Sequence, residues 1–408
     1  MAMQTETKRA CVTGGSGYIA SELIKQLLLK GFGVKTTVRD PVSLSFSDFL
    51  PSKHADNAAK ISHLEELRGL GALQVYRAEL AEEGSFDEAV AGCEYVFLVA
   101  APVNAFSENP EVKLVVTCAP YLSIISSCIA DLKQMKLSET NCSYTEVRKF
   151  LSVKSMGLCD LISFEFPKGE ELIKPASKGT LNVMKSCVKA KSVKRIVLTS
   201  SAAAVSLTPL EGIGHVLDEE SWSDIEYLQT EKPPSWGYAV SKVVAEKEAS
   251  KFAQDNNISL VTVLPVLTVG PSLIAEARVS LALSLALLSG NEELINGLKI
   301  METLSGSISL VHVEDVCRAH IFVAESPSAL GRYICCSVNT GLVELAISLQ
   351  QRYQQYKVST DFGGLPAKAR LSLSSEKLLK GGFEFKFKKL EEIYDDVVEY
   401  AKAKGLLP

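Results

Sequence analysis

The chain has 408 residues, 47% hydrophobic and 22% charged, which suits one large or two closely packed globular domains with a sizeable core. Its formal net charge of −5, without an Arg/Lys run, argues against a nucleic-acid or anionic-membrane surface and favours a small neutral or anionic metabolite as partner. Ten irregularly spaced cysteines and a polar N-terminus without an apolar leader predict a reduced, cytoplasmic protein with no metal site and no stable membrane insertion.

The first two thirds of the chain alternate between strand and helix patterns. The opening pattern is a strand at 9–13, a glycine turn at 14–17, a helix at 18–30 and a strand at 34–38. Further strands are predicted at 73–76, 94–100, 193–199 and 258–263, and further helices at 85–91, 171–190 and 236–254. Such alternation predicts an α/β fold with a doubly wound parallel Rossmann sheet.

After Pro265 the pattern becomes irregular. It predicts helices at 279–288, 314–325, 342–352 and 390–402, with a strand at 332–336. We therefore expect a nucleotide-binding domain over 1–265 and a smaller, mainly substrate-binding lobe over 266–408, laid over the carboxyl edge of the sheet.

The first turn carries a dinucleotide-binding pattern, Thr13-Gly14-Gly15-Ser16-Gly17-Tyr18-Ile19-Ala20. Between a strand and a helix, glycines permit a tight turn and a close approach of pyrophosphate to backbone N–H groups at the helix N-terminus. Ala20, at the third small position, still allows the helix to pack on the strand. The alternative is a plain glycine-rich turn.

Arg39 ends the second strand, 22 residues after Gly17, where an NAD-specific site would place an acid for the ribose 2′-hydroxyl. An arginine suits a 2′-phosphate, so the sequence favours NADPH. The alternative is that Arg39 is a solvated surface residue beside Asp40 without a role in cofactor binding. Two further strand ends are candidates for cofactor contact: Glu79 and Leu80 at the adenine, and Val99, Ala100 and Ala101 along the cofactor's path.

Tyr238 and Lys242 are four residues apart on one predicted helix, so their side chains share a face. A free tyrosine has a pKa near 10, and a neighbouring cation lowers such a pKa towards the working range of an acid/base group. Ser200 and Ser201 close a strand at the same sheet edge and could polarise a reacting oxygen. The alternatives are a partly buried aromatic beside a solvated lysine, and serines that cap a turn.

His312 could act as a base or a metal ligand. We expect a structural role instead, with Glu314 and Asp315 favouring the start of the helix that follows.

Six segments together with the glycine turn resemble the extended short-chain dehydrogenase/reductases of plant flavonoid biosynthesis, the dihydroflavonol reductase-like group. They are 37–41 (TVRDP), 198–205 (LTSSAAAV), 236–238 (WGY), 290–292 (GNE), 311–320 (VHVEDVCRAH) and 331–336 (GRYICC). Ala20 in place of a third glycine, and Ser-Ser-Ala-Ala-Ala where dihydroflavonol reductases tend to read Ser-Ser-Ala-Gly-Thr, point to the branch that acts on anthocyanidins.

The resemblance implies NADPH-dependent reduction of anthocyanidins to 2,3-cis-flavan-3-ols of the epicatechin type, with a loose association with other flavonoid-pathway enzymes. By position, Ser201, Tyr238 and Lys242 match the catalytic residues, and Tyr238 and Lys242 also contact the cofactor. The other matched cofactor contacts are Gly14, Gly17, Ala20, Arg39, Lys60 and 99–101, with Pro265 and Thr268 in 265–270 at the nicotinamide end. Ala239 departs from the proline usual in the family.

Two segments, 42–55 and 112–169, have no counterpart in the family pattern, and the second is rich in cysteine. We interpret them as atypical insertions, either translated non-coding sequence or genuine loops. The first lies near the adenosine phosphate contacts and the second near the substrate entrance. The resemblance therefore leaves two alternatives open, a dihydroflavonol or cinnamoyl-CoA-type reductase and a catalytically impaired NADP-binding homologue.

Overall fold

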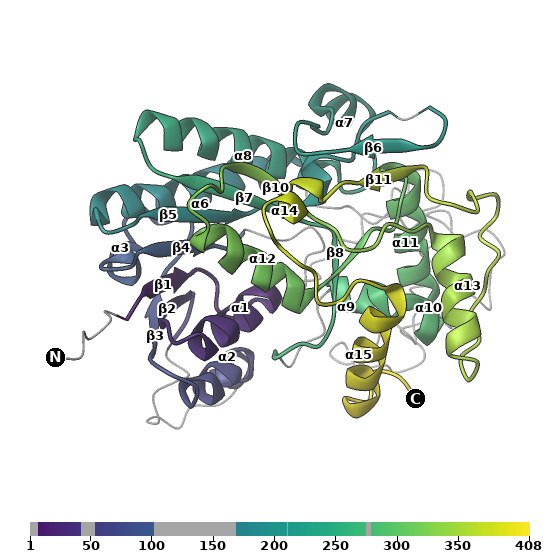
Figure 1. Ribbon diagram of the computed structural model, residues 1–408, viewed down its shortest axis with the longest axis horizontal. Helices are drawn as coiled ribbons and strands as arrows, with labels where there is room; N and C mark the ends of the chain where they lie inside the picture. The colour runs from purple at the N-terminus through teal and green to yellow at the C-terminus, as the bar shows by residue number, and fades with distance from the viewer. Residues whose placement is uncertain (1–6, 42–53, 102–168, 210, 275–278) are drawn as a thin grey trace, which may run out of the picture. The chain divides into compact units, whose positions relative to one another are not determined.

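The computed structural model describes residues 7–41, 54–101, 169–209, 211–274 and 279–408, with the side chains of 54–60 and 169–171 outside the description (Figure 1). These ranges belong to one compact unit, Met1–Val103 with Gly169–Pro408. The two predicted insertions lie outside the described residues, apart from their last residues, which begin α2 (His54–Arg68) and α6 (Gly169–Ala190).

A parallel sheet of seven strands forms the centre of this unit, in the order β10-β7-β5-β4-β1-β2-β3. Its strands are β1 (Arg9–Val12), β2 (Gly33–Val38), β3 (Leu73–Arg77), β4 (Tyr95–Leu98), β5 (Arg195–Thr199), β7 (Leu260–Pro265) and β10 (Gly331–Cys335). Val12 pairs with Thr36 on one side and Phe97 on the other, so the strand order reverses direction around β1. In a sheet of this order, ligands bind outside the carboxyl ends of the strands at the reversal. The predicted doubly wound Rossmann fold is confirmed.

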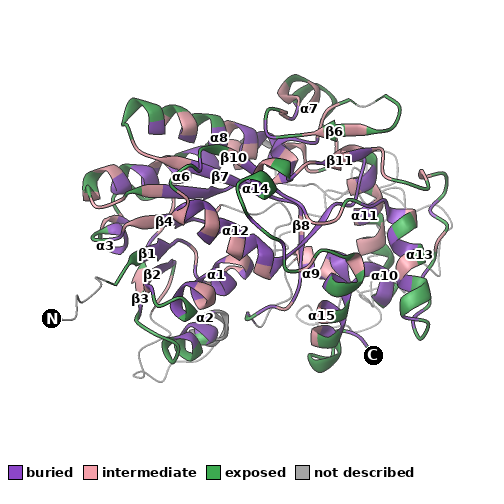
Figure 2. Ribbon diagram, viewed as in Figure 1, coloured by how far each residue is buried: buried purple, intermediate pink, exposed green. Residues whose placement is uncertain are grey.

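Helices cover both faces of the sheet. α1 (Tyr18–Leu29), α2 and α12 (Val313–Glu325) lie on one face, and α3 (Asp87–Val90), α6 and α8 (Trp236–Asp255) lie on the other (Figure 1). Consecutive strand residues are therefore buried on opposite faces: Ile196 and Val197 are both 0% exposed, and the central strands are mostly purple in Figure 2. Burial on both faces explains why these strands read as continuous apolar runs.

The residues after Pro265 build a second hydrophobic cluster and also contribute to the main sheet. The elements around the cluster are β8 (Leu267–Val269), α9 (Val279–Ser284), α10 (Ala286–Ser289), α11 (Glu292–Ser305), β9 (Leu310–His312), α13 (Leu342–Arg352) and α15 (Leu390–Ala403). β10 leaves this part and pairs with β7 in the main sheet. The division at residue 265 stays a prediction, and the sheet itself extends past it.

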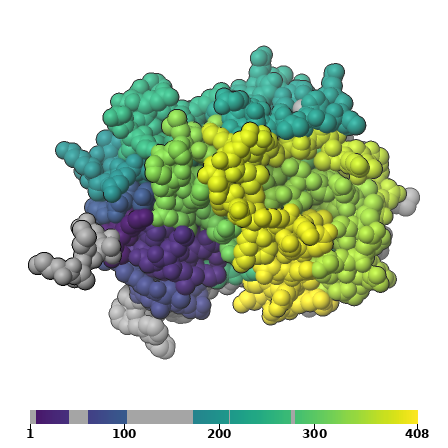
Figure 3. Space-filling view, viewed as in Figure 1, coloured from purple at the N-terminus to yellow at the C-terminus, as the bar shows by residue number. Residues whose placement is uncertain are grey.

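Short elements complete the described fold. They are a 3₁₀ turn η3 (Ala202–Ala204), α7 (Ile225–Glu231), α14 (Glu376–Lys380), and the paired strands β6 (His215–Leu217) and β11 (Leu371–Leu373). On the face in Figure 3, yellow C-terminal residues lie beside purple N-terminal ones. Accordingly, the Gln26 amide donates to the Glu314 carbonyl (3.2 Å), and the Lys386 ammonium contacts the Glu314 carboxylate (2.8 Å). No helix among the described residues has the length and apolar character needed to cross a membrane.

The structure departs from the predicted elements in the C-terminal part. The helix expected over 279–288 is interrupted at Leu285 and forms α9 and α10. The helix α11 was not predicted, although Asn291 caps it by accepting a hydrogen bond from the Leu294 N–H (3.1 Å) and Gly306 ends it. An apolar sequence buried on several sides has no clear period, so it does not show where one helix ends and the next begins.

His312 has the structural role expected for it. Its Nδ1 accepts a hydrogen bond from the Glu314 N–H (3.2 Å) and so caps α12, while its Nε2 lies 2.9 Å from an Asp396 carboxylate oxygen. The ring stacks on Phe387 with 3.7 Å between centroids. Burial lowers the His312 pKa although Asp396 favours the charged form. The residue thus joins α12 to the C-terminal helix.

His320 gives the fold a pH dependence that can be measured. Its Nδ1 donates to the Val316 carbonyl (2.7 Å), its Nε2 lies 2.8 Å from the Thr199 hydroxyl, and burial lowers its pKa to about 4. An unfolded histidine titrates near 6.5. Above about pH 6.5, His320 is neutral in both the folded and the unfolded chain. As the pH falls towards 4, the unfolded chain binds a proton that the folded chain does not, and the free energy of unfolding decreases by on the order of 3 kcal/mol in total.

We predict that the free energy of unfolding, from urea titrations between pH 7.5 and pH 4.5, falls less steeply with acid in His320→Gln than in the wild type. Glutamine preserves hydrogen-bonding groups at this position and does not titrate. The other buried histidines titrate in both proteins, so the difference between the two slopes reports His320 alone. Equal slopes would contradict the assignment.

Candidate active site

The glycine turn is shaped by close contacts that only glycine permits. Gly14 has φ +75°, and a Cβ there would lie 3.0 Å from the Ala100 Cβ. A Cβ on Gly15 would lie 2.4 Å from the Thr36 hydroxyl oxygen, far inside contact distance. The turn therefore sits directly on β2 and on the end of β4, where the sheet order reverses.

Thr13 fastens this turn to the predicted strand end 99–101. Its side chain is fully buried, and its hydroxyl oxygen accepts hydrogen bonds from the N–H groups of Val99 (3.0 Å) and Ala100 (2.9 Å). Thr37 holds the other side, because its hydroxyl accepts from the Gly14 N–H (3.1 Å). The predicted pyrophosphate turn and the small residues of 99–101 are thus adjacent.

The N-terminus of α1 is left without a side-chain cap. Gly17 occupies the cap position, and Ser16, Tyr18, Ile19 and Ala20 surround the first turn. An uncapped first turn directs backbone N–H groups and the positive end of the helix dipole out of the helix, which suits a pyrophosphate. Ala20 is fully buried, so the small residue there serves close packing, as predicted.

Two aromatic rings brace the glycine turn from outside it. The Tyr18 hydroxyl donates to the Gly270 carbonyl (2.7 Å), so this residue joins the turn to the segment after β8. His63, on α2, lies with Nε2 2.9 Å from the Gly15 carbonyl oxygen and is 4% exposed. Its Nδ1 is buried and has no hydrogen-bond partner among the described residues. Burial lowers the His63 pKa, so the ring is neutral and donates through Nε2.

The sequence analysis did not find His63. It lies 48 residues from Gly15 in the chain, and a single histidine on a helix has no distinguishing pattern. The helix α2, which carries His63, is also not among the predicted elements.

The candidate adenosine contacts follow β2 and β3. Arg39 is exposed directly after β2, Glu79 and Leu80 come two and three residues after β3, and Lys60 lies on α2 with its side chain outside the described residues. The Leu80 carbonyl accepts a hydrogen bond from the Asn182 amide (2.8 Å), and a Cβ on Gly179 would lie 3.0 Å from the Leu80 Cβ. Leu80 therefore packs on α6, whereas the Arg39 side chain is exposed.

Ser201 lies two residues after the end of β5 and is the cap residue of η3. Its backbone is extended (φ −158°), its hydroxyl accepts from the Ala203 N–H (3.1 Å), and the residue is half-buried, so the capping role is present. Ser200 differs, because it is buried and its hydroxyl donates to Glu246 (2.8 Å). Of the two serines, Ser200 is buried and Ser201 is half-buried, and the catalytic role of Ser201 stays a prediction.

Tyr238 and Lys242 lie on the first turns of α8, which contacts η3. Ser235, with φ 63°, directs the chain sharply into this helix. The Lys242 ammonium lies 5.6 Å from the Tyr238 ring centroid, and both side chains are half-buried. No residue in the described ranges forms a hydrogen bond with the Tyr238 hydroxyl, which leaves that group available to a ligand.

Pro265 and Thr268 lie on the other side of β5. Pro265 is the last residue of β7, and Thr268 lies within β8, where its hydroxyl donates to the Val266 carbonyl (3.2 Å). Pro265 therefore reaches the same carboxyl edge as Ser201. The Thr268 hydroxyl is used within its own segment, and its contact with a cofactor stays a prediction.

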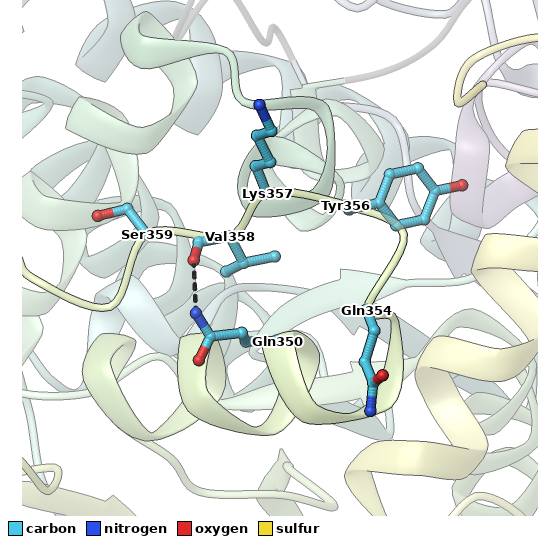
Figure 4. A pocket seen from close by; sticks show the side chains of 6 residues that line it. All are labelled: Gln350, Gln354, Tyr356, Lys357, Val358 and Ser359. Atoms are coloured by element: carbon cyan, nitrogen blue, oxygen red, sulfur yellow. Dashed lines mark hydrogen bonds between the residues drawn. The ribbon is translucent and has the colours of Figure 1, made fainter.

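Most of the predicted residues thus follow the carboxyl ends of β1, β2, β3, β4, β5 and β7, whereas Lys60 lies on α2, Tyr238 and Lys242 lie on α8, and Thr268 lies within β8. A surface pocket of about 510 Å³ lies elsewhere, beside α13, where the Gln350 amide donates to the Val358 carbonyl (3.1 Å) (Figure 4). None of the predicted site residues lines that pocket. The candidate active site is therefore defined by the residues at the carboxyl edge of the sheet and not by this pocket.

Comparisons with known proteins agree with this reading. Residues 162–336 match the NAD dependent epimerase/dehydratase family. The chain is 49% identical over 400 residues to an anthocyanidin reductase ((2S)-flavan-3-ol-forming) of Vitis vinifera, covering 98% of this chain and 97% of the relative. It is 34% identical over 408 residues to a bifunctional dihydroflavonol 4-reductase/flavanone 4-reductase of Malus domestica, covering 100% of this chain and 94% of the relative.

Among solved structures, the chain is similar to vestitone reductase from alfalfa (Medicago sativa L.), with a TM-score of 0.68, 29% identity, and coverage of 98% of this chain and 99% of that one. The shared architecture, and a sequence identity of 49% over 98% of this chain, both support one family. This chain belongs to the anthocyanidin reductase family of Rossmann-fold oxidoreductases.

Proposed function

We propose that this chain is an NADPH-dependent reductase that converts anthocyanidins to 2,3-cis-flavan-3-ols of the epicatechin type. The observations that support it most are the glycine turn after β1, Ser201 after β5, and the Tyr238/Lys242 pair on α8, the helix that contacts η3. Membership of the anthocyanidin reductase family supplies the substrate class.

The residues of the first βα turn fit a dinucleotide phosphate. Gly14 and Gly15 pack against Ala100 and Thr36, where a Cβ would collide, and the tight turn that they permit brings the N-terminus of α1 to the position of a phosphate. The uncapped N-terminus of α1 offers N–H groups and positive potential, and Arg39 offers a guanidinium for a 2′-phosphate. NADPH bound in this way supplies the hydride for the reduction.

The side chains at the edge divide the remaining work. Lys242, whose ammonium lies 5.6 Å from the Tyr238 ring centroid, holds the ribose hydroxyls. Tyr238 transfers the proton to or from the substrate, and the Ser201 hydroxyl forms a hydrogen bond with a substrate oxygen and polarises it. Pro265 borders the nicotinamide end from β7.

Dihydroflavonols are the second candidate substrate class. The full-length similarity to a dihydroflavonol 4-reductase supports it, at a lower identity than to the anthocyanidin reductase. An assay with cyanidin and dihydroquercetin side by side separates the two classes. Turnover of dihydroquercetin but not of cyanidin would replace the first proposal with the second.

We also propose a cytoplasmic setting with a loose association with other flavonoid-pathway enzymes, and a mainly substrate-binding role for 266–408. These proposals rest on the resemblance to the family. Fractionation of plant tissue and cross-linking to neighbouring enzymes test the first two.

Tyr238→Phe tests the proposed proton transfer. We expect NADPH consumption with cyanidin to fall roughly 10²–10⁴-fold, because a positioned acid/base group contributes about that much to the rate. NADPH binding, followed by the fluorescence of the reduced cofactor, should change little. Tyr356→Phe is the matched control, since its hydroxyl donates to the Pro408 carbonyl (2.9 Å), remote from the sheet edge. Full activity of Tyr238→Phe would reject the role.

Arg39→Ala tests the choice of cofactor. Loss of a charged hydrogen bond to the 2′-phosphate should raise the Kd for NADPH roughly 10- to 100-fold, while the Kd for NADH stays within about twofold. The control is Arg68→Ala, which removes an exposed guanidinium paired with Glu65 on α2. A parallel rise in both dissociation constants would show that Arg39 does not read the 2′-phosphate.

His63→Leu tests the brace behind the glycine turn. Removal of the hydrogen bond to the Gly15 carbonyl should raise the Kd for NADPH up to about tenfold, since a neutral hydrogen bond contributes about 1 kcal/mol. His63→Gln keeps a donor at the Nε2 position and should bind NADPH nearly as the wild type does. If both variants bind equally well, the brace has no part in cofactor binding.

A further inference from the structure

A buried carboxylate lies directly behind the predicted catalytic residues. Glu246 is on α8, one turn after Lys242, and is 1% exposed. One of its oxygens accepts a hydrogen bond from the Ser200 hydroxyl (2.8 Å), and the other accepts from the Nε of Arg332 on β10. The carboxylate therefore joins α8, β5 and β10 at a single point.

Arg332 extends this connection to a fourth segment. Its Nη1 donates to the carbonyls of Glu219 and Ser221, at 2.7 Å each, and its guanidinium stacks on Trp222 with 3.6 Å to the ring centroid. The Glu219 carboxylate in turn accepts from the Ile334 N–H (3.0 Å). The arginine is thus held on several sides before it meets Glu246.

Such an ion pair is not explained by stability alone. Removing two charges from water costs several kcal/mol per ion, and apolar side chains of similar volume often stabilise a core as well or better. What a pair held by several hydrogen bonds supplies is a fixed geometry, although the Arg332 Nη2 is buried without a hydrogen-bond partner among the described residues. Burial raises the pKa of Glu246 above its ordinary value, and Arg332, Ser200 and Lys242 oppose that effect by favouring the charged form.

The geometry that is fixed here is that of the end of β5. Successive side chains of an extended chain point to opposite faces, so Ser200 faces the helix α8 while Ser201 faces the other way. Ser200 is 6% exposed, and its hydroxyl has the Glu246 carboxylate as acceptor. A hydrogen bond that holds Ser200 also holds the backbone from which Ser201 projects.

We propose that Glu246, anchored by Arg332, is a positioning residue that acts through Ser200 to set the Ser201 hydroxyl in register with Tyr238 and Lys242. The inference rests on the proposed function, because Ser201 is its catalytic serine. The same carboxylate belongs to the helix that carries Tyr238 and Lys242, so one group aligns both halves of the site. Ser200 is then required for turnover although it touches neither substrate nor cofactor.

The test compares Ser200→Ala with Ser200→Thr in the full chain. Ser200→Ala removes only the hydroxyl, and we expect kcat with cyanidin to fall about tenfold or more, since small misplacements of a catalytic group are costly. The Kd for NADPH should stay within about twofold. Ser200→Thr retains the hydroxyl and should recover most of kcat. If Ser200→Ala does not fold, Ser200→Cys, with its weak donor, replaces it in the same comparison.

Ser206→Ala is the matched control. Ser206 is also buried in the segment after β5, and its hydroxyl donates to the Ala202 carbonyl (3.1 Å) without contact to Glu246. We expect its kcat to equal that of the wild type. An unchanged kcat in Ser200→Ala or Ser200→Cys, or an equal loss in Ser206→Ala, would overturn the inference while the proposed function stands. Failure of the wild type to reduce cyanidin would overturn the proposed function and this inference with it.

Discussion

The pair of hydrogen bonds that the Thr13 hydroxyl accepts from Val99 and Ala100 is the constraint on which the rest of the site depends. It joins the ends of β1 and β4, where the sheet order reverses. The helices α1 and α6, which follow these two strands, lie on opposite faces of the sheet, and a crevice forms at such a point. The glycine turn lies on this junction because no Cβ would fit at Gly14 or Gly15. The place for a dinucleotide is therefore set by backbone contacts and one buried hydroxyl.

Parts of the chain that are remote in sequence hold this edge in place. His63 reaches the turn from α2, and Tyr18 reaches from the turn to Gly270 after β8. The hydrogen bond between Tyr18 and Gly270 joins residues 252 positions apart in the chain. Gly270 also packs closely on His312, because a Cβ on Gly270 would collide with that ring. The cofactor turn and the C-terminal part consequently belong to one compact unit.

The features that the sequence could predict are those in which neighbouring residues determine the outcome. The alternation of strands and helices, the glycine turn and the four-residue spacing of Tyr238 and Lys242 are all local patterns. His63 and Arg332 act on partners 48 and 86 residues away, and the sequence has no period or motif that links such positions. The break at Leu285 was missed for a related reason, because an apolar helix buried on several sides loses its 3.6-residue signal.

Ser200 and Ser201 are adjacent serines whose different surroundings cannot be told from the sequence pattern alone. As a sequence they are two identical side chains at a strand end, and either could be assigned to catalysis. The alternation of an extended backbone directs them to different sides, so Ser200 meets the covering helix α8 while Ser201 stays half-buried at the cap of η3. The buried one would be an unsatisfied hydroxyl unless the helix offered an acceptor, and Glu246 is that acceptor. A buried carboxylate in turn needs a cation, which Arg332 provides from β10. The Ser200 hydroxyl therefore has an acceptor on α8 while the neighbouring Ser201 hydroxyl caps η3, and through their shared backbone the two serines are parts of one arrangement.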